Sequence, residues 1–93
     1  MAVRVIVPDV LVPLAAGRRV LVLDPPPRTV GDAFRTIRTQ WPGVYDRVIT
    51  ETVEVRPHVN LFIGDEDVRQ CGGLDAPVPD GGEVYILPAV SGG

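Results

Sequence analysis

The fold is decided by TVGDAFRTIRTQW (residues 29–41), where apolar residues recur at the spacing of one helix face. Thr29 is a suitable N-cap, and Asp32 lies three residues later, where it suits both the capping box and the helix dipole. Pro42-Gly43 supplies a stop signal. The apolar stripe consists of Val30, Ala33, Phe34, Ile37 and Trp41. The sequence therefore predicts one main helix, whose stripe needs a sheet to cover.

Short stretches rich in β-branched residues lie on both sides of this helix. The predicted strands are 3–7, 19–23, 58–63 and 83–87. Pro8 ends the first strand and the prolines at 25–27 end the second, because proline cannot donate a hydrogen bond to a sheet. Two strands in succession predict an opening hairpin. In the last strand, Val84 and Ile86 are expected to point inward.

The remaining segments are less regular. Residues 44–55 predict a helical turn at 45–49 followed by a loop. Residues 64–67 predict a turn, with a short return strand beginning at 68–69. The segment 79–82, Pro-Asp-Gly-Gly, is a strong turn signal before the last strand.

This order of elements indicates an α+β protein. One helix across one face of a mixed sheet gives a roll of the β-grasp (ubiquitin-like) type. In that fold the first and last strands lie side by side at the centre. We therefore expect a β-grasp domain at 1–88 and an extended, flexible C-terminal tail at 89–93.

Length and composition narrow the function classes. The chain has 93 residues, 45% of them hydrophobic, which suits a single globular domain. The net charge is −3 and no basic cluster with interleaved aromatics is present, so nucleic acid is not predicted as a partner. No stretch is long and apolar enough to predict a membrane span. Cys71 is the single cysteine, so neither an internal disulfide nor a multi-cysteine metal site is expected. This fits a reducing compartment, and a cytoplasmic location is expected.

The end of the chain carries the strongest functional signal. Gly92 and Gly93 close the sequence, and at average glycine usage two terminal glycines arise by chance about 0.5% of the time. Because glycine has no side chain, five residues form a thin strip that reaches about 17 Å and can enter a narrow channel. A carboxylate is a poor electrophile, so chemistry at Gly93 requires activation, usually by attack on the α-phosphate of ATP in a partner's active site.

The sequence resembles the ubiquitin-like sulfur carriers, which include the molybdopterin synthase small subunit and the carriers of the thiamine and cysteine pathways. Most of the chain takes part, and the tail LPAVSGG (87–93) is its most specific part. The other matching stretches are 3–8, 29–31, 41–43, 59–60, 66–69, 80–81 and 83–84. Residues 67–69 and 72–74 look most like the cysteine-pathway branch, whereas Gly64-Asp65 and 56–58 depart from many relatives.

The resemblance implies that this protein is a carrier and not an enzyme. An E1-like adenylyltransferase/sulfurtransferase would adenylate Gly93 with ATP, and the adenylate would become a thiocarboxylate that donates sulfur. No bound cofactor is implied. The downstream sulfur-accepting partner would be a cysteine synthase-like enzyme, the molybdopterin synthase large subunit or a thiazole-forming enzyme. A JAMM-type metalloprotease is a further partner.

Three functional hypotheses stay open. The first is the sulfur carrier, in the cysteine branch, in a pathway to a specialised sulfur-containing metabolite, or as the molybdopterin synthase small subunit. The second is a ubiquitin-like modifier joined to lysines through the same adenylate. The third is a passive interaction module to which the tail is irrelevant.

Residues outside the tail are candidates for partner binding. Phe62, Leu87 and Pro88 are expected to form an apolar patch that docks the activating enzyme, with Arg69 as a charged rim. The alternative is that they cap a minor core under the loop at 74–78. Within the tail, Ala89, Val90 and Ser91 would contact the partner's channel.

Two further side chains are assigned no role. Cys71 could relay sulfur as a persulfide, but a lone loop cysteine without a basic neighbour is more often incidental. His58 has no nucleophile suggested beside it and is expected to be structural.

Overall fold

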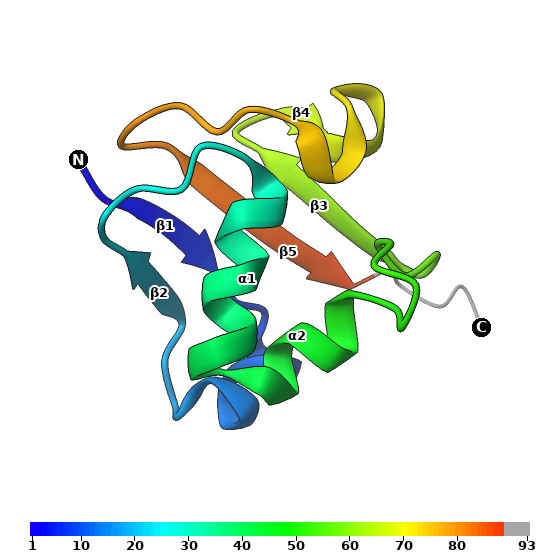
Figure 1. Ribbon diagram of the computed structural model, residues 1–93. Helices are drawn as coiled ribbons and strands as arrows, with labels where there is room; N and C mark the ends of the chain where they lie inside the picture. The colour runs from blue at the N-terminus through cyan, green and yellow to red at the C-terminus, as the bar shows by residue number, and fades with distance from the viewer. Residues whose placement is uncertain (89–93) are drawn as a thin grey trace.

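Strands from the two ends of the chain lie next to each other at the centre of one mixed sheet (Figure 1). The computed structural model describes residues 1–88. The sheet has five strands in the order β2-β1-β5-β3-β4. The strands are β1 (Val3–Ile6), β2 (Val20–Leu23), β3 (Val59–Ile63), β4 (Glu66–Asp67) and β5 (Glu83–Pro88). The α-helices are α1 (Val30–Gln40) and α2 (Pro42–Val48), and the 3₁₀ helices are η1 (Asp9–Ala15), η2 (Val68–Gln70) and η3 (Gly73–Asp75).

The pairing of the strands confirms the predicted β-grasp roll. β1 and β5 are parallel, with Val5 opposite Val84, and each has an antiparallel neighbour on its other side. α1 crosses one face of this sheet (Figure 1). β5 is thus held between two strands, and the first and last strands are central as expected.

The core lies between the sheet and α1. Val5 and Val84 are fully buried, and Ile86 is 2% exposed, which confirms the predicted inward face of β5. From α1, Phe34 and Ile37 fill the space above them. Burying each large apolar side chain contributes about 1.5–3 kcal/mol. The apolar stripe of α1 therefore packs against the inward-facing residues of the strands, as the sequence predicts.

The start of α1 is capped as predicted. The Oγ1 atom of Thr29 accepts a hydrogen bond from the backbone N–H of Asp32 (3.1 Å). The Asp32 carboxylate accepts from Nη1 of Arg35 (3.2 Å) and lies in the first turn, where it favours the helix dipole. In a full capping box the Asp32 side chain would accept a hydrogen bond from the backbone N–H of Thr29. Here the Asp32 side chain pairs with Arg35 instead.

A second α-helix begins where only a stop was predicted. α1 ends at Gln40 and α2 begins at Pro42, so the predicted turn at 45–49 belongs to a longer helix that starts earlier and ends at Val48. Proline suits this position because the first residue of a helix needs no N–H partner. Gly43 permits close packing, since a Cβ there would lie 3.2 Å from Leu14.

Two other segments differ from the predictions. The predicted turn at 64–67 is only two residues long, and Glu66–Asp67 form β4 instead. Gly64 has a φ of +58°, as a two-residue hairpin turn requires. The expected return strand at 68–69 is the 3₁₀ helix η2, capped by the Asp67 carboxylate, which accepts from the backbone of Arg69 (2.9 Å).

A tight loop at 50–54 holds a valine in the left-handed conformation. Val53 has a φ of +61° and is 58% exposed. The loop is closed by hydrogen bonds from Thr50 N to Glu54 O (2.8 Å) and from Glu54 N to Oγ1 of Thr50 (3.1 Å). Because the Cβ of an L-residue lies too close to the following carbonyl oxygen in the left-handed region, this backbone conformation is strained at Val53.

Val53→Gly is expected to raise the free energy of unfolding by about 0.5–1 kcal/mol, since relief of about 1–2 kcal/mol of strain exceeds the entropic cost of glycine. Chemical denaturation measures the change. Val53→Ala is the matched control, because it keeps a Cβ and should give no gain. Equal stabilities for the glycine and alanine variants would contradict a strained Val53.

Candidate functional site at the end of the last strand

β5 keeps its pairing up to its last residue. Leu87 lies opposite Asn60, and Pro88 lies opposite Val59 on β3. The predicted site residues Ala89, Val90, Ser91, Gly92 and Gly93 lie outside the described residues, as does the predicted tail as a whole. The chain therefore enters that segment from a central strand whose last residues, 86–88, are paired with β3, while β1 pairs with β5 only at residues 83–85.

Phe62 and Leu87 lie together on the face of the sheet opposite the helices. Phe62 pairs with Tyr85, and both residues line a shallow hollow of about 360 Å³ with Leu87. Leu87 is 45% exposed, as the predicted outward face requires. Pro88 is also exposed, but the alternation of β5 places its ring on the other face with Val59. The expected apolar patch therefore contains Phe62 and Leu87 but not Pro88.

The alternative of a minor core under the 74–78 loop is wrong. Leu74 packs against the main core on the helix side, where it shares a hollow with Phe34. In the same loop Ala76 is fully buried and Val78 is 7% exposed, both in the main core. The loop thus covers the opposite side of the sheet from Phe62 and Leu87.

The apolar surface on this side is larger than the sequence reasoning found. The outer sheet face, as we call it, comprises Ile6, Val20, Val22, Phe62, Tyr85 and Leu87. Val22 is 57% exposed and Val20 37% exposed. Strand alternation was the available signal, because Val20 and Val22 alternate with the buried Leu21 and Leu23.

Charged groups flank the outer sheet face at the start of β5. The Tyr85 hydroxyl donates to the Glu83 carboxylate (2.8 Å), and this hydrogen bond is the main cause that raises the pKa of Tyr85. Nε of Arg4 lies 3.7 Å from the same carboxylate. Asp65 lines the hollow beside Phe62. Tyr85 therefore stays protonated near neutral pH and offers the face an apolar ring.

The guanidinium of Arg69 is turned toward its own chain. Nη1 donates to Oδ1 of Asn60 (3.0 Å), and Nη2 donates to the carbonyls of Val59 (2.6 Å) and Arg56 (2.9 Å). The first two acceptors lie opposite Leu87 and Pro88 of β5. The structure thus brings Arg69, a predicted site residue, to the end of the sheet where the described chain stops.

Cys71 is held as a hydrogen-bonded thiol. Its Sγ donates to Oε2 of Glu66 (3.1 Å), and this bond is the largest cause that raises the pKa of the Cys71 thiol. Burial and the negative charges of Glu66 and Asp67 act in the same direction. Because the thiolate is the nucleophile, these contacts make Cys71 less reactive.

Alkylation of Cys71 is expected to need a higher pH than alkylation of an ordinary cysteine. A raised pKa means that the thiolate forms later as the pH rises, and Glu66→Gln removes the charge that opposes it. Iodoacetamide labelling between about pH 7 and 10, followed by mass spectrometry, should therefore show a lower midpoint for Glu66→Gln.

Glu51→Gln is the matched control for this labelling, because it removes an exposed carboxylate from a different loop. It should leave the midpoint unchanged. Identical midpoints for the native chain and Glu66→Gln would refute the effect of Glu66.

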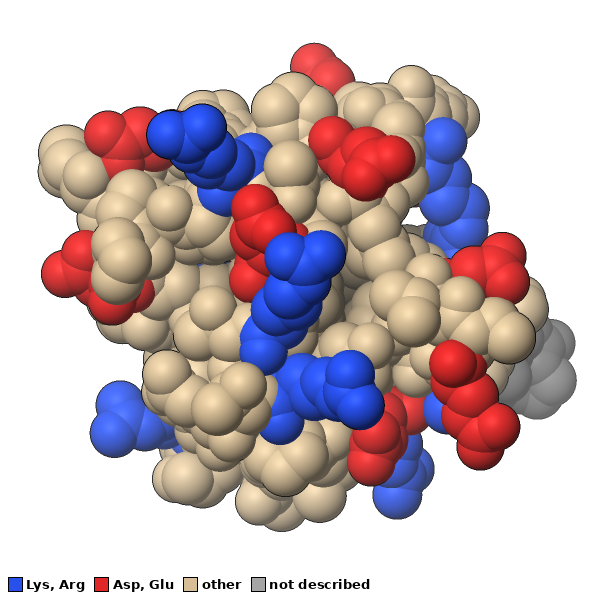
Figure 2. All heavy atoms as spheres, in the orientation of Figure 1, with Lys and Arg blue, Asp and Glu red and all other residues tan. Residues whose placement is uncertain are grey.

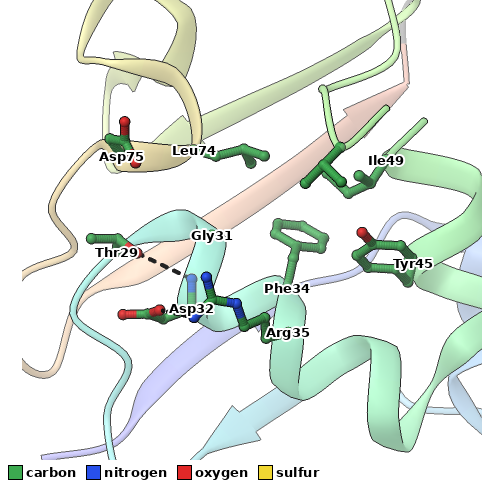
Figure 3. Close-up of a pocket in the computed structure, with 10 residues that line it drawn as sticks. Thr29, Gly31, Asp32, Phe34, Arg35, Tyr45, Ile49, Leu74 and Asp75 are labelled. Carbon is green, nitrogen blue, oxygen red and sulfur yellow. Dashed lines mark hydrogen bonds and ion pairs between the residues drawn. The ribbon is translucent and has the colours of Figure 1, made fainter. Parts of the chain in front are cut away.

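The helix side carries a hollow of about 540 Å³ between α1, α2 and η3 (Figure 3). Phe34 and Tyr45 face it, while the Asp32 and Arg35 side chains at its edge pair with each other. Over this side of the molecule acidic and basic groups are interspersed (Figure 2). Within residues 1–88, no buried side-chain polar atom lacks a hydrogen-bond partner.

Across residues 1–88 no cluster of His, Cys, Asp and Glu side chains has the arrangement of a metal site. In the same range no helix has the length and hydropathy needed to cross a bilayer.

Fold and site together define a ubiquitin-like β-grasp protein whose sequence continues from a central strand to a diglycine end. Residues 5–93 match the model of the ThiS family. The sulfur carrier protein CysO of Mycobacterium tuberculosis is 34% identical over 95 residues, covering 100% of both chains. This protein belongs to the ThiS family, within the class of sulfur carriers that its sequence resembles.

Other relatives extend this relationship. Small archaeal modifier protein 3 of Haloferax volcanii is 37% identical over 65 residues, which is 70% of each chain. In the crystal structure of the Amycolatopsis orientalis BexX/CysO complex, one chain superposes with a TM-score of 0.87 at 34% identity. The match covers 99% of this chain and 100% of that one.

Proposed function

We propose that this protein carries sulfur as a thiocarboxylate on Gly93. The observation that carries the proposal is the family match, which continues through the diglycine end to residue 93. The full-length similarity to a protein named as a sulfur carrier supports the same conclusion. The protein acts as a carrier in this scheme, and its partners supply the catalytic groups.

The proposed chemistry proceeds in two steps. An oxygen of the Gly93 carboxylate attacks the α-phosphate of ATP in an E1-like adenylyltransferase, and pyrophosphate leaves. A sulfur nucleophile then attacks the acyl carbon and AMP leaves, so that a carbon–sulfur bond replaces the bond to the adenylate oxygen. ATP is therefore bound by the partner, and positioning of the carboxylate is what this chain contributes.

The outer sheet face is the proposed docking surface for the activating enzyme. It presents exposed apolar side chains around Phe62 and Leu87, with Asp65 and Glu83 close by. Exposed apolar surface with a polar surround is typical of a protein interface. Leu87 also belongs to the strand that precedes the tail, so docking there holds the origin of the tail close to the enzyme.

For the sulfur-accepting step we favour a cysteine synthase-like enzyme or an enzyme of specialised sulfur metabolism. The similarity to CysO and to a chain of the BexX/CysO complex supports this choice over a molybdopterin synthase large subunit or a thiazole-forming enzyme. A JAMM-type metalloprotease, which the family resemblance implies, is proposed as a further partner.

A second candidate is a ubiquitin-like modifier that forms isopeptide bonds with lysines. The similarity to small archaeal modifier protein 3 supports it, although over a shorter part of the chain. Both functions use the same adenylate of Gly93. They differ in the nucleophile that attacks it, which is sulfur in the carrier and a lysine amine in the modifier.

Intact-protein mass spectrometry is expected to detect the thiocarboxylate. After incubation with an E1-like enzyme, ATP and a sulfide source, the full chain should gain the mass of replacing one oxygen by sulfur. A chain that lacks Gly93 should gain nothing, because its carboxylate is one residue too short. Conjugates to lysines instead of this gain, with an enzyme proven active on another carrier, would favour the modifier.

Leu87→Asp and Phe62→Asp are expected to weaken docking of the activating enzyme. Placing a charge in the apolar contact should raise the KM for the carrier about tenfold, the change that corresponds to a loss of about 1.4 kcal/mol in binding. The value of kcat should change little. Steady-state pyrophosphate release at varied carrier concentration measures both constants.

Val10→Asp is the matched control for these variants, because Val10 is 67% exposed and lies in η1, away from the outer sheet face. Its KM should equal that of the native chain. If all three variants shared one KM, the docking surface would lie elsewhere.

A further inference from the structure

Within residues 1–88, the start of β3 has no neighbouring strand on its outer edge. β4 is only two residues long and pairs with Phe62 and Ile63, so it does not extend to Val59 and Asn60. On their other side these two residues pair with Pro88 and Leu87 of β5. The part of β3 that supports the end of β5 would thus be a bare edge if nothing else covered it.

Arg69 covers this edge. Nη2 donates to the carbonyls of Val59 and Arg56, and Nη1 donates to the side chain of Asn60. The backbone of Arg69 is itself fixed, since its N–H donates to the Asp67 carboxylate. The guanidinium therefore replaces the missing strand over the first residues of β3.

Only arginine suits these three acceptors. Its planar guanidinium presents donors on separate nitrogens in a fixed fork. A lysine carries its donors on a single nitrogen, so it cannot reach the Asn60 oxygen and both carbonyls in the same geometry. The contacts of this side chain are thus specific for shape as well as for charge.

We propose that Arg69 is a positioning residue for sulfur loading. It braces the start of β3 and so holds the Pro88 end of β5 at a fixed place relative to the outer sheet face. This inference rests on the proposed function, because it assigns Arg69 a part in presenting Gly93 to the activating enzyme. The sequence predicts that Arg69 contacts the activating enzyme directly. In this proposal Arg69 acts through contacts within its own chain.

The physical reason is the limited reach of the chain beyond Pro88. Gly93 is five residues further on, which spans at most about 17 Å. When the enzyme binds the outer sheet face, a shift of Pro88 away from its place changes the distance that the five residues must span for Gly93 to reach the active site. A misplacement of about 1 Å can lower the rate of a positioned reaction by about 100-fold.

The test compares Arg69→Met and Arg69→Lys with Arg18→Met, which removes an exposed arginine from the loop before β2. Adenylation kinetics with the E1-like enzyme are the first measurement. We expect kcat to fall at least about tenfold in both Arg69 variants, with KM within about twofold of the native value. Arg18→Met should match the native chain.

Amide hydrogen exchange by NMR is the second measurement, and it needs no enzyme. In Arg69→Met, amides at the start of β3 and the end of β5 should exchange faster, while those of β1 and β2 keep their protection. If Arg69→Met fails to fold, Asn60→Ala removes one acceptor and should show the same local pattern to a smaller degree.

Several outcomes would overturn the inference. A raised KM with unchanged kcat, restored by lysine, would make Arg69 a docking contact. Unchanged exchange at the β3–β5 end would show that Arg69 does not brace it. A native chain that no activating enzyme charges would instead refute the proposed function, and the exchange pattern would still decide whether Arg69 braces the strands.

Discussion

The structure depends on the parallel pairing of β1 with β5. This pairing joins the two ends of the described chain, so α1 and the other strands pack around a centre that exists only when both ends are in place. Val5 and Val84 are opposite each other and fully buried, and Phe34 of α1 packs in the same core. β5 lies between β1 and β3, but its last residues pair with β3 alone, so β3 is the strand that holds the point from which the segment leading to Gly93 begins.

The same arrangement divides the surface into two sides with different properties. α1, α2 and the loop around Leu74 cover one face of the sheet, and charged groups of both signs cover those helices (Figures 1 and 2). The opposite face has no helix over it within residues 1–88 and exposes apolar side chains such as Val22 and Leu87. A partner that binds this face also lies next to the origin of the tail, which links docking with access to the carboxylate.

Functional chemistry and structural support are carried by different residues. The proposed reaction uses only the terminal carboxylate of this chain, so the rest of the domain serves to place it. Arg69 illustrates this division, because its side chain makes contacts that hold β3 and through it the end of β5. Cys71 shows the opposite case, since its contact with Glu66 favours the unreactive thiol.

The sequence by itself determined the main helix, the principal strands and the diglycine end, because helix and strand periodicity and a terminal motif are local properties. It predicted only a helical turn at 45–49 in place of the full α2, since Pro42-Gly43 serves equally well as the end of one helix or the start of the next. Only the tertiary structure decided that β4 is too short to cover β3, and that Arg69 completes that edge. Such roles depend on which segments become neighbours in space, and local periodicity carries no information about those distant contacts.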